Sequence, residues 1–152
     1  MLTKTTLSGI RALMVLASRG PDPLSPTAIA ERIGESPTYM AKVTSRLSRA
    51  GLLLSQRGAG GGVRLRLPPS QITLLAVVEA CQGNLVPDYC GDQAWHTKTC
   101  AFHRAAAELH EAVVGVLTRW TLAALMVNPS GLGVFSQSCR CWTGALPESM
   151  RR

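Results

Sequence analysis

Acidic residues are scarce in the first half of this 152-residue chain. Residues 1–67 contain three Asp or Glu but ten Lys or Arg, for a net charge of +7, whereas residues 68–152 contain six of each sign. The entire net charge of the protein therefore lies in one half. A basic segment joined to a neutral remainder predicts a protein that binds nucleic acid with one end and something else with the other.

Long hydrophobic runs are also missing. No apolar stretch reaches the roughly 18 residues that cross a bilayer, and the N-terminus lacks the apolar core and cleavage site of a signal peptide. We therefore expect a cytoplasmic protein without a membrane partner. In that reducing compartment the five cysteines are expected to be thiols or metal ligands rather than disulfides. Their odd number excludes complete pairing within one chain.

Enzyme signatures are absent as well. The chain has no Cys-x-x-Cys motif and no nucleotide-binding fingerprint, and the glycine-rich run at residues 58–62 is not followed by the Lys-Ser/Thr of a phosphate-binding loop. The thiols of Cys90 and Cys100 are the only support for a small redox enzyme. The protein is therefore not expected to be an enzyme.

The same helix-start pattern occurs twice. Ser-Pro-Thr at residues 25–27 and again at 36–38 places Ser at an N-cap and Pro in the first helical position. These patterns predict helices over residues 26–33 and 37–50, after a first helix at residues 9–18. Two short helices joined by a glycine-containing turn, the second of them basic, are typical of a helix-turn-helix. An ordinary helical hairpin with solvated charges is the alternative.

Two strand-like segments follow at residues 52–57 and 63–67, separated by the glycine-rich run. A basic hairpin directly after a helix-turn-helix predicts the wing of a winged helix, which contacts phosphates or the minor groove of DNA while the second helix enters the major groove. The expected fold is mostly α-helical with this small β-hairpin wing. A winged-helix module that binds protein instead of DNA is the alternative. The expected contacts to double-stranded DNA are Ser36, Thr38, Tyr39, Lys42 and Arg46 from the helix, and Arg57, Gly60 and Gly61 from the wing, where glycine allows close approach.

The second half is expected to contain a short helix and a long one. Thr73 can cap a helix that ends at Gln82, in which Cys81 would be a small buried hydrophobe. From residue 101 to 127, apolar residues recur with the spacing of a heptad seam. We expect this seam to pair with a second copy, giving a homodimer that binds a palindromic site, although packing across the first helix is possible as well. The seam residues are Phe102, Ala106, Leu109, Val113, Val116, Trp120 and Ala123.

These segments predict four regions. A winged helix-turn-helix spans residues 1–69, a helix and sensor loop 70–100, a dimerisation helix 101–127, and a poorly ordered tail rich in Gly, Ser and Pro 128–152. The hydrophobic fraction of 46% is high for a lone domain, which also indicates that part of the surface is covered by another subunit.

Several motifs resemble those of one family. LSRAGL at residues 47–52, SQRGAGGG at 55–62, ITL at 72–74 and VVEA at 77–80 are similar to the IscR/NsrR-type (Rrf) family of bacterial winged-helix repressors. The resemblance implies a homodimeric DNA-binding transcription regulator whose loop before the long helix holds a sensing site, commonly an iron–sulfur cluster. Family members respond to cluster status, nitric oxide, iron or redox state, and a minority sense without a cluster.

The resemblance places the sensing site in that loop. Cys100 and His103 match the end of the family pattern and Cys90 a position near its start, while the middle cysteine is missing and His96 is the only ligand-capable replacement in the segment. Cys90, Cys100 and His103, with His96 or Cys81 as the fourth ligand, would suffice for a cluster, 2Fe–2S rather than 4Fe–4S. A zinc site on the same ligands, a reversible Cys90–Cys100 disulfide and the absence of any sensor are the alternatives.

Overall fold

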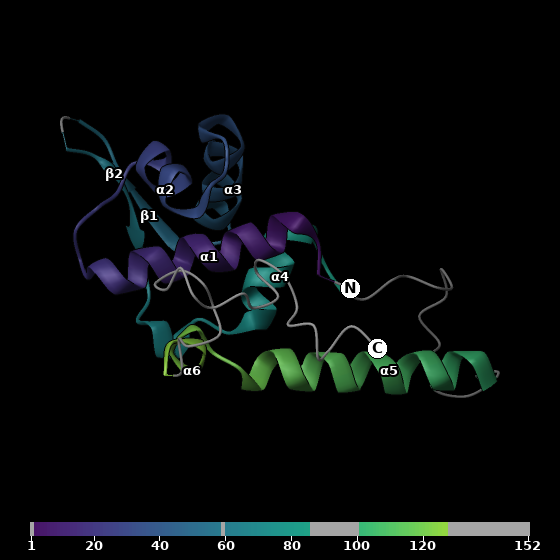
Figure 1. Ribbon diagram of the computed structural model, residues 1–152. Coiled ribbons are helices and arrows are strands. Elements are labelled where there is room, and N and C mark those ends of the chain that lie inside the picture. The colour runs from purple at the N-terminus through teal and green to yellow at the C-terminus, as the bar shows by residue number, and fades with distance from the viewer. Residues whose placement is uncertain (1, 59, 86–100, 128–152) are drawn as a thin grey trace, which may run out of the picture.

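The computed structural model describes residues 2–58, 60–85 and 101–127, and these form a mostly helical protein with one β-hairpin (Figure 1). None of the helices in these ranges is both long and apolar enough to cross a membrane. The elements in chain order are α1 (Lys4–Arg19), α2 (Pro26–Ile33), α3 (Pro37–Arg49), β1 (Leu53–Gln56), β2 (Gly62–Leu65), a short 3-10 helix η1 (Pro69–Gln71), α4 (Leu74–Gln82), α5 (Ala101–Arg119) and α6 (Leu122–Met126).

Local capping sets where the helices begin. Five of them start after a Ser or Thr whose side-chain oxygen accepts a hydrogen bond from the backbone N–H three residues later. The start of α1 was predicted at residue 9 but lies at Lys4, because Thr3 caps the helix and the apolar pattern is preceded by a polar first turn. The predicted starts of α2, α3 and α4 are confirmed. The capping residues are Thr3, Ser25, Ser36, Thr73 and Thr121.

Helix α1 lies at the centre of the core. Figure 1 shows it between the α2–α3 pair on one side and α4 and α6 on the other. Its fully buried Leu13, Met14 and Leu16 pack in one cluster with core residues of the neighbouring elements, which include Leu47 and Leu122. One continuous core therefore joins the helix-turn-helix to the elements that follow the hairpin.

The hairpin is antiparallel, with Leu53 opposite Leu65 and Gln56 opposite Gly62. Its strands are shorter than the predicted 52–57 and 63–67. A third segment pairs with it at one point, since the backbone N–H and C=O of Leu24 bond to those of Val63 at 3.0 and 2.9 Å. A Cβ on Gly62 would lie 2.5 Å from the carbonyl carbon of Leu24. Glycine at this position therefore lets the hairpin dock on the chain that leads into α2.

The predicted single helix from 101 to 127 is wrong in one respect, because the chain breaks at Trp120. The carbonyl of Trp120 accepts a hydrogen bond from the N–H of Leu74, and the N–H of Leu122 donates to Ile72, both at 2.8 Å. These bonds turn the chain, Thr121 caps α6, and Leu122 becomes fully buried. The helix therefore ends here, because the chain gains buried apolar contacts and backbone hydrogen bonds beside α4. As a result α5 is about 28 Å long, at about 1.5 Å per residue.

Candidate nucleic-acid interface

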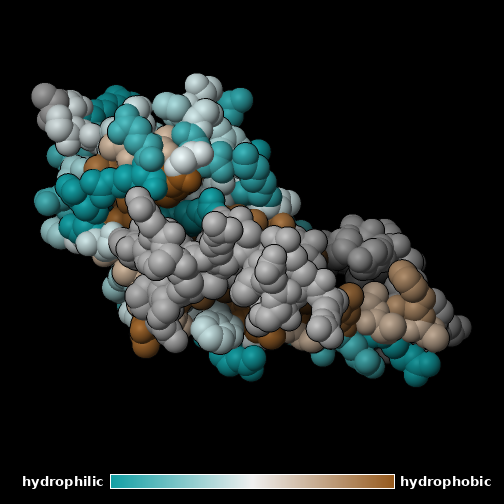
Figure 2. Space-filling view, viewed as in Figure 1, coloured by the Kyte–Doolittle hydropathy of each residue, from teal (hydrophilic) through white to brown (hydrophobic). Residues whose placement is uncertain are grey.

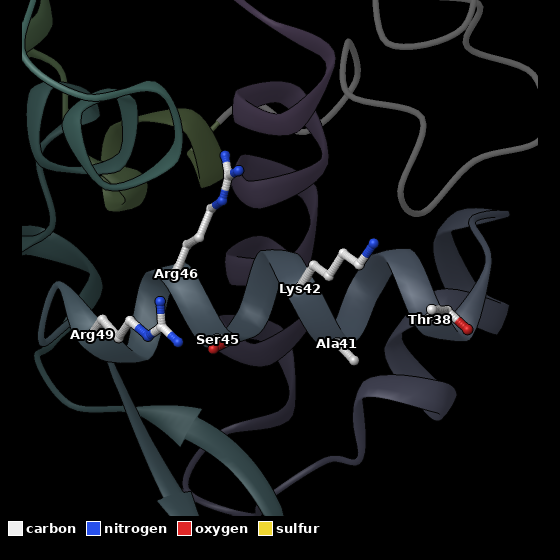
Figure 3. A pocket seen from close by; sticks show the side chains of 6 residues that line it. All are labelled: Thr38, Ala41, Lys42, Ser45, Arg46 and Arg49. Atoms are coloured by element: carbon white, nitrogen blue, oxygen red, sulfur yellow. The ribbon is translucent and has the colours of Figure 1, made fainter.

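One face of α3 is open to solvent. Each of its residues lies three or four positions from another of them, a spacing that brings side chains to one side of a helix. Small and polar side chains alternate with cations along it, and they line a shallow hollow together with Arg46 (Figure 3). Met40 and Leu47, on the opposite side of the helix, are fully buried. The residues of this face, called the α3 face below, are Thr38, Ala41, Lys42, Ser45 and Arg49.

The α3 face continues onto the hairpin. A second hollow runs from the first turn of α2 past Ser45 and Arg49 to Ser55 and Val63 of the two strands. The hydroxyls of Ser48 and Ser55 lie 3.3 Å apart and join α3 to β1. Helix α3 and the hairpin therefore form one surface, and Figure 2 shows hydrophilic residues gathered over this part of the molecule.

Two of the five predicted helix contacts, Thr38 and Lys42, lie on the α3 face. The other three have partners within the protein. Ser36 accepts the N–H of Tyr39 at 3.2 Å as the N-cap of α3, the half-buried Tyr39 donates its hydroxyl to Thr5 of α1 at 3.3 Å, and Arg46 bonds to α4. Whether these three also touch DNA stays a prediction.

Sequence reasoning left Ala41, Ser45 and Arg49 out of the expected contacts. The signal for them is their position: each lies three, seven or eleven residues after Thr38 and therefore on its side of the helix. Arg49 adds a second exposed cation to the α3 face beside Lys42.

The turn before α3 is fixed to the start of α1 by charge. Lys4 Nζ lies 3.3 Å from Glu35 Oε2 and 5.3 Å from the centre of the Tyr39 ring. Ser8 donates to Glu35 Oε1 at 3.1 Å. This carboxylate is thus satisfied within the protein and presents little negative charge to a polyanion.

One cation of the wing lies near its tip. Arg57 is exposed, as expected of a phosphate contact. A Cβ on Gly61 would lie 2.4 Å from the carbonyl oxygen of Gln56, whereas a Cβ on Gly60 would meet nothing within 4 Å. Gly61 is therefore required by the turn itself, and Gly60, whose φ is +78°, is required by its backbone conformation. A role of either glycine in close approach to DNA stays a prediction.

The predicted sensing residues cannot be located relative to one another in the described part of the chain. Cys90, His96 and Cys100 lie outside the described residues, as does the side chain of His103, which belongs to the first turn of α5. The residues that are described contain no group of three or more His, Cys, Asp or Glu that could hold a metal.

Cys81 is a buried free thiol, as predicted, with 2% of its surface exposed. Burial raises its pKa to about 11, against the opposing effect of the nearby Arg46 charge. The thiol is therefore protonated at neutral pH and is a poor metal ligand in this arrangement, because metals bind the thiolate.

A second surface, on α5, is apolar. Phe102 and Leu109 are 64% and 67% exposed, and Val116 and Trp120 are 46% and 45% exposed. All four belong to the predicted heptad seam. This set, called the α5 seam, therefore presents large apolar side chains to solvent along most of the helix.

Comparison with known proteins agrees with this architecture. A family model described as "Rrf2: Iron-dependent Transcriptional regulator" matches residues 2–128. The chain is 33% identical over 138 residues to the HTH-type transcriptional regulator NsrR of Halalkalibacterium halodurans, covering 86% of this chain and 93% of that one. It is 32% identical over 134 residues to the HTH-type transcriptional repressor NsrR of Streptomyces coelicolor, covering 86% and 90%.

Among solved structures, CymR (YrzC), the global cysteine regulator of B. subtilis, superposes with a TM-score of 0.70 at 27% identity, covering 84% of this chain and 96% of that one. The predicted winged-helix class is thereby confirmed. The relatives are transcription regulators and not enzymes, as expected. The match over residues 2–128 shows that this chain belongs to the Rrf2 family of transcriptional regulators.

Proposed function

We propose that the protein is a repressor that binds double-stranded operator DNA with the α3 face in the major groove and Arg57 of the wing on the phosphate backbone. The observation that carries this proposal is the continuous surface of α3 and the hairpin, where Lys42, Arg49 and Arg57 are exposed. The acid nearest to α3, Glu35, is paired with Lys4. Cations on such a surface bind phosphates, and small side chains such as Ala41 let a helix enter the groove closely.

The repressor acts as a homodimer on a palindromic operator. The α5 seam supports this, because large apolar side chains that are about half exposed or more mark an interaction site, and the same seam of a second copy is self-complementary about a two-fold axis. Two recognition helices related in this way address two half-sites of one operator. Operator binding also places the protein in the cytoplasm.

The segment before α5, together with the first turn of that helix, senses the signal. Two thiols and two imidazoles, from Cys90, Cys100, His103 and His96, are donors that suit iron in a 2Fe–2S cluster, where His can replace Cys. The family description as iron-dependent supports iron as the metal. A cluster held there would supply a redox-active group that nitric oxide or oxygen can alter. Zinc on the same residues, or a Cys90–Cys100 disulfide, would give a cluster-free sensor, and the cysteine regulator among the structural neighbours supports keeping that alternative.

Two measurements test these proposals. Protein purified without oxygen should be brown, with iron and acid-labile sulfide near stoichiometric amounts. A sample that stays colourless after reconstitution would contradict the cluster and direct attention to zinc and the thiols. For DNA, a duplex selected by the protein from a random library should bind less tightly to the Lys42→Gln and Arg57→Ala variants, while Arg119→Gln at the far end of α5 serves as the control for lost charge. Unchanged affinity in both variants would contradict the proposed surface.

A further inference from the structure

Arg46 differs from the other cations of α3 in where its side chain goes. Figure 3 shows it directed away from Ala41 and Ser45, toward the neighbouring helices. Its Nη1 donates to the backbone carbonyl of Cys81 at 2.6 Å, across 35 positions of sequence. Part of the side chain is solvent-exposed, but the guanidinium is committed to a partner inside the protein.

The acceptor lies at a favourable place for a cation. Cys81 is in the last turn of α4, where carbonyl groups have no partner within the helix and carry the negative end of the helix dipole. A guanidinium that donates to such a carbonyl makes a charge-assisted hydrogen bond, which is stronger than a bond between neutral groups.

The end of α4 is itself firmly held on α1. Gln82 Oε1 accepts from the backbone N–H of Thr3 at 3.1 Å and from the hydroxyl of Thr6 at 2.9 Å. Beside it, the sulfur of Cys81 packs against Gly9. The Arg46 bond therefore ends on a fixed point and not on a mobile group.

Helix α3 is thus tied down at two places. Tyr39 bonds to α1 near the first turn of α3. Arg46, seven positions or about two turns of helix later, bonds to α4. Two bonds separated in this way set the direction in which the α3 face points, because the helix could pivot about a single one.

We propose that Arg46 is a positioning residue, which orients the recognition helix through the Cys81 carbonyl and makes no contact with DNA phosphates. This inference rests on the proposed function, in that α3 is taken as the DNA-reading helix. A positioning residue and a phosphate contact differ in a measurable way. Each phosphate contact releases counterions and steepens the salt dependence of binding, whereas a bond within the protein does not.

The test compares Arg46→Gln with Arg49→Gln in the full-length protein, with Arg119→Gln as the control for net charge. Binding is measured on the duplex selected from a random library and on a shuffled duplex, from about 50 to about 300 mM salt. Arg49→Gln should weaken binding to both duplexes and reduce the slope of log K against log salt by about 0.9 per protomer.

Arg46→Gln should instead leave that slope as in the wild type. Affinity for the selected duplex should fall on the order of tenfold, because one charge-assisted hydrogen bond is lost. Affinity for the shuffled duplex should change by less than about twofold, since the orientation of α3 matters for reading bases but little for attraction to phosphates. A slope reduced as in Arg49→Gln, or unchanged affinity for the selected duplex, would overturn the proposal.

Arg46→Lys provides a test that keeps the charge and guards against misfolding of the glutamine variant. Lysine binds phosphate well but its shorter side chain places the ammonium farther from the Cys81 carbonyl. We expect several-fold weaker binding to the selected duplex with the wild-type slope, and full wild-type affinity would overturn the proposal. If Arg49→Gln and Lys42→Gln both keep the wild-type slope, α3 is not the DNA surface, and the proposed function fails before the role of Arg46 is reached.

Discussion

Gly9 of α1 faces Cys81 of α4 so closely that a Cβ on Gly9 would lie 2.8 Å from the sulfur. Both residues are buried. The two helices meet at this point, beside the hydrogen bonds that Thr3 and Thr6 donate to Gln82. The closeness of α1 and α4 thus depends on a missing side chain on one helix and a small one on the other.

Gly9→Ala should therefore destabilise the protein by about 1–3 kcal/mol, because an added methyl group in a packed core forces its neighbours apart. Urea denaturation measures the loss. Cys81→Ala removes the clashing sulfur, so the double variant should lose less stability than the two single variants lose in sum. Gly115→Ala is the matched control, since a Cβ there meets nothing within 4 Å, and it should stabilise α5 by up to about 1 kcal/mol. Equal effects of the two alanines would contradict the close contact.

The Cys81 thiol should make stability depend on pH in the alkaline range. Its pKa is raised from 9.0 to about 11 in the folded protein, mainly by burial. Above pH 9 the unfolded chain loses this proton while the folded protein keeps it, so stability falls as the pH rises toward 11. Between these pH values we expect the free energy of unfolding of the wild type to fall by on the order of 1–2 kcal/mol more than that of Cys81→Ala. Parallel stability curves for the two proteins would argue against the raised pKa.

The α5 seam should control the oligomeric state. Leu109→Glu places a charge among the exposed apolar side chains. We expect the proposed dimer to dissociate at least about a hundredfold more readily, because each protomer loses the burial of one leucine. Light scattering on a dilution series measures this change. Thr118→Glu introduces the same charge at an exposed position off the seam and should leave the dimer intact. A Leu109→Glu variant that remains dimeric would rule out the α5 seam as the interface.

The glycines of the wing should differ in their tolerance of substitution. Gly61→Ala would place a Cβ against the backbone of Gln56 and Gly58 and should disrupt the turn and weaken operator binding. Gly60→Asn should cost less, because its surroundings are open and Asn adopts the positive φ of this position more readily than most residues do. Binding to the selected duplex, compared with helix content from circular dichroism, separates a lost wing from a lost fold. Equal DNA affinity in both variants would mean that the turn geometry does not matter for binding.

Much of this architecture could be read from local sequence. The Ser-Pro-Thr starts of α2 and α3, the Thr73 cap of α4 and the glycine-rich turn act within a few residues of themselves, so their structural effect does not depend on distant parts of the chain. The strand-like segments on either side of the glycine-rich run predicted the hairpin, and the motifs around residues 47–80 identified the family. Thr38 and Lys42, two of the predicted DNA contacts, lie on the open face of α3, and their contact with DNA stays a prediction.

What the sequence by itself determined is thus the order of elements, the basic surface and the apolar seam. Tertiary structure decided where individual side chains and one helix end go. In the sequence Arg46 is one basic residue of α3 among several, and only the fold brings a carbonyl at the end of α4 within its reach. Tyr39 points inward because Thr5 of α1 accepts a hydrogen bond from its hydroxyl. The break at Trp120 arises from bonds to residues 72–74, since backbone groups paired with a distant segment outweigh a local helical pattern.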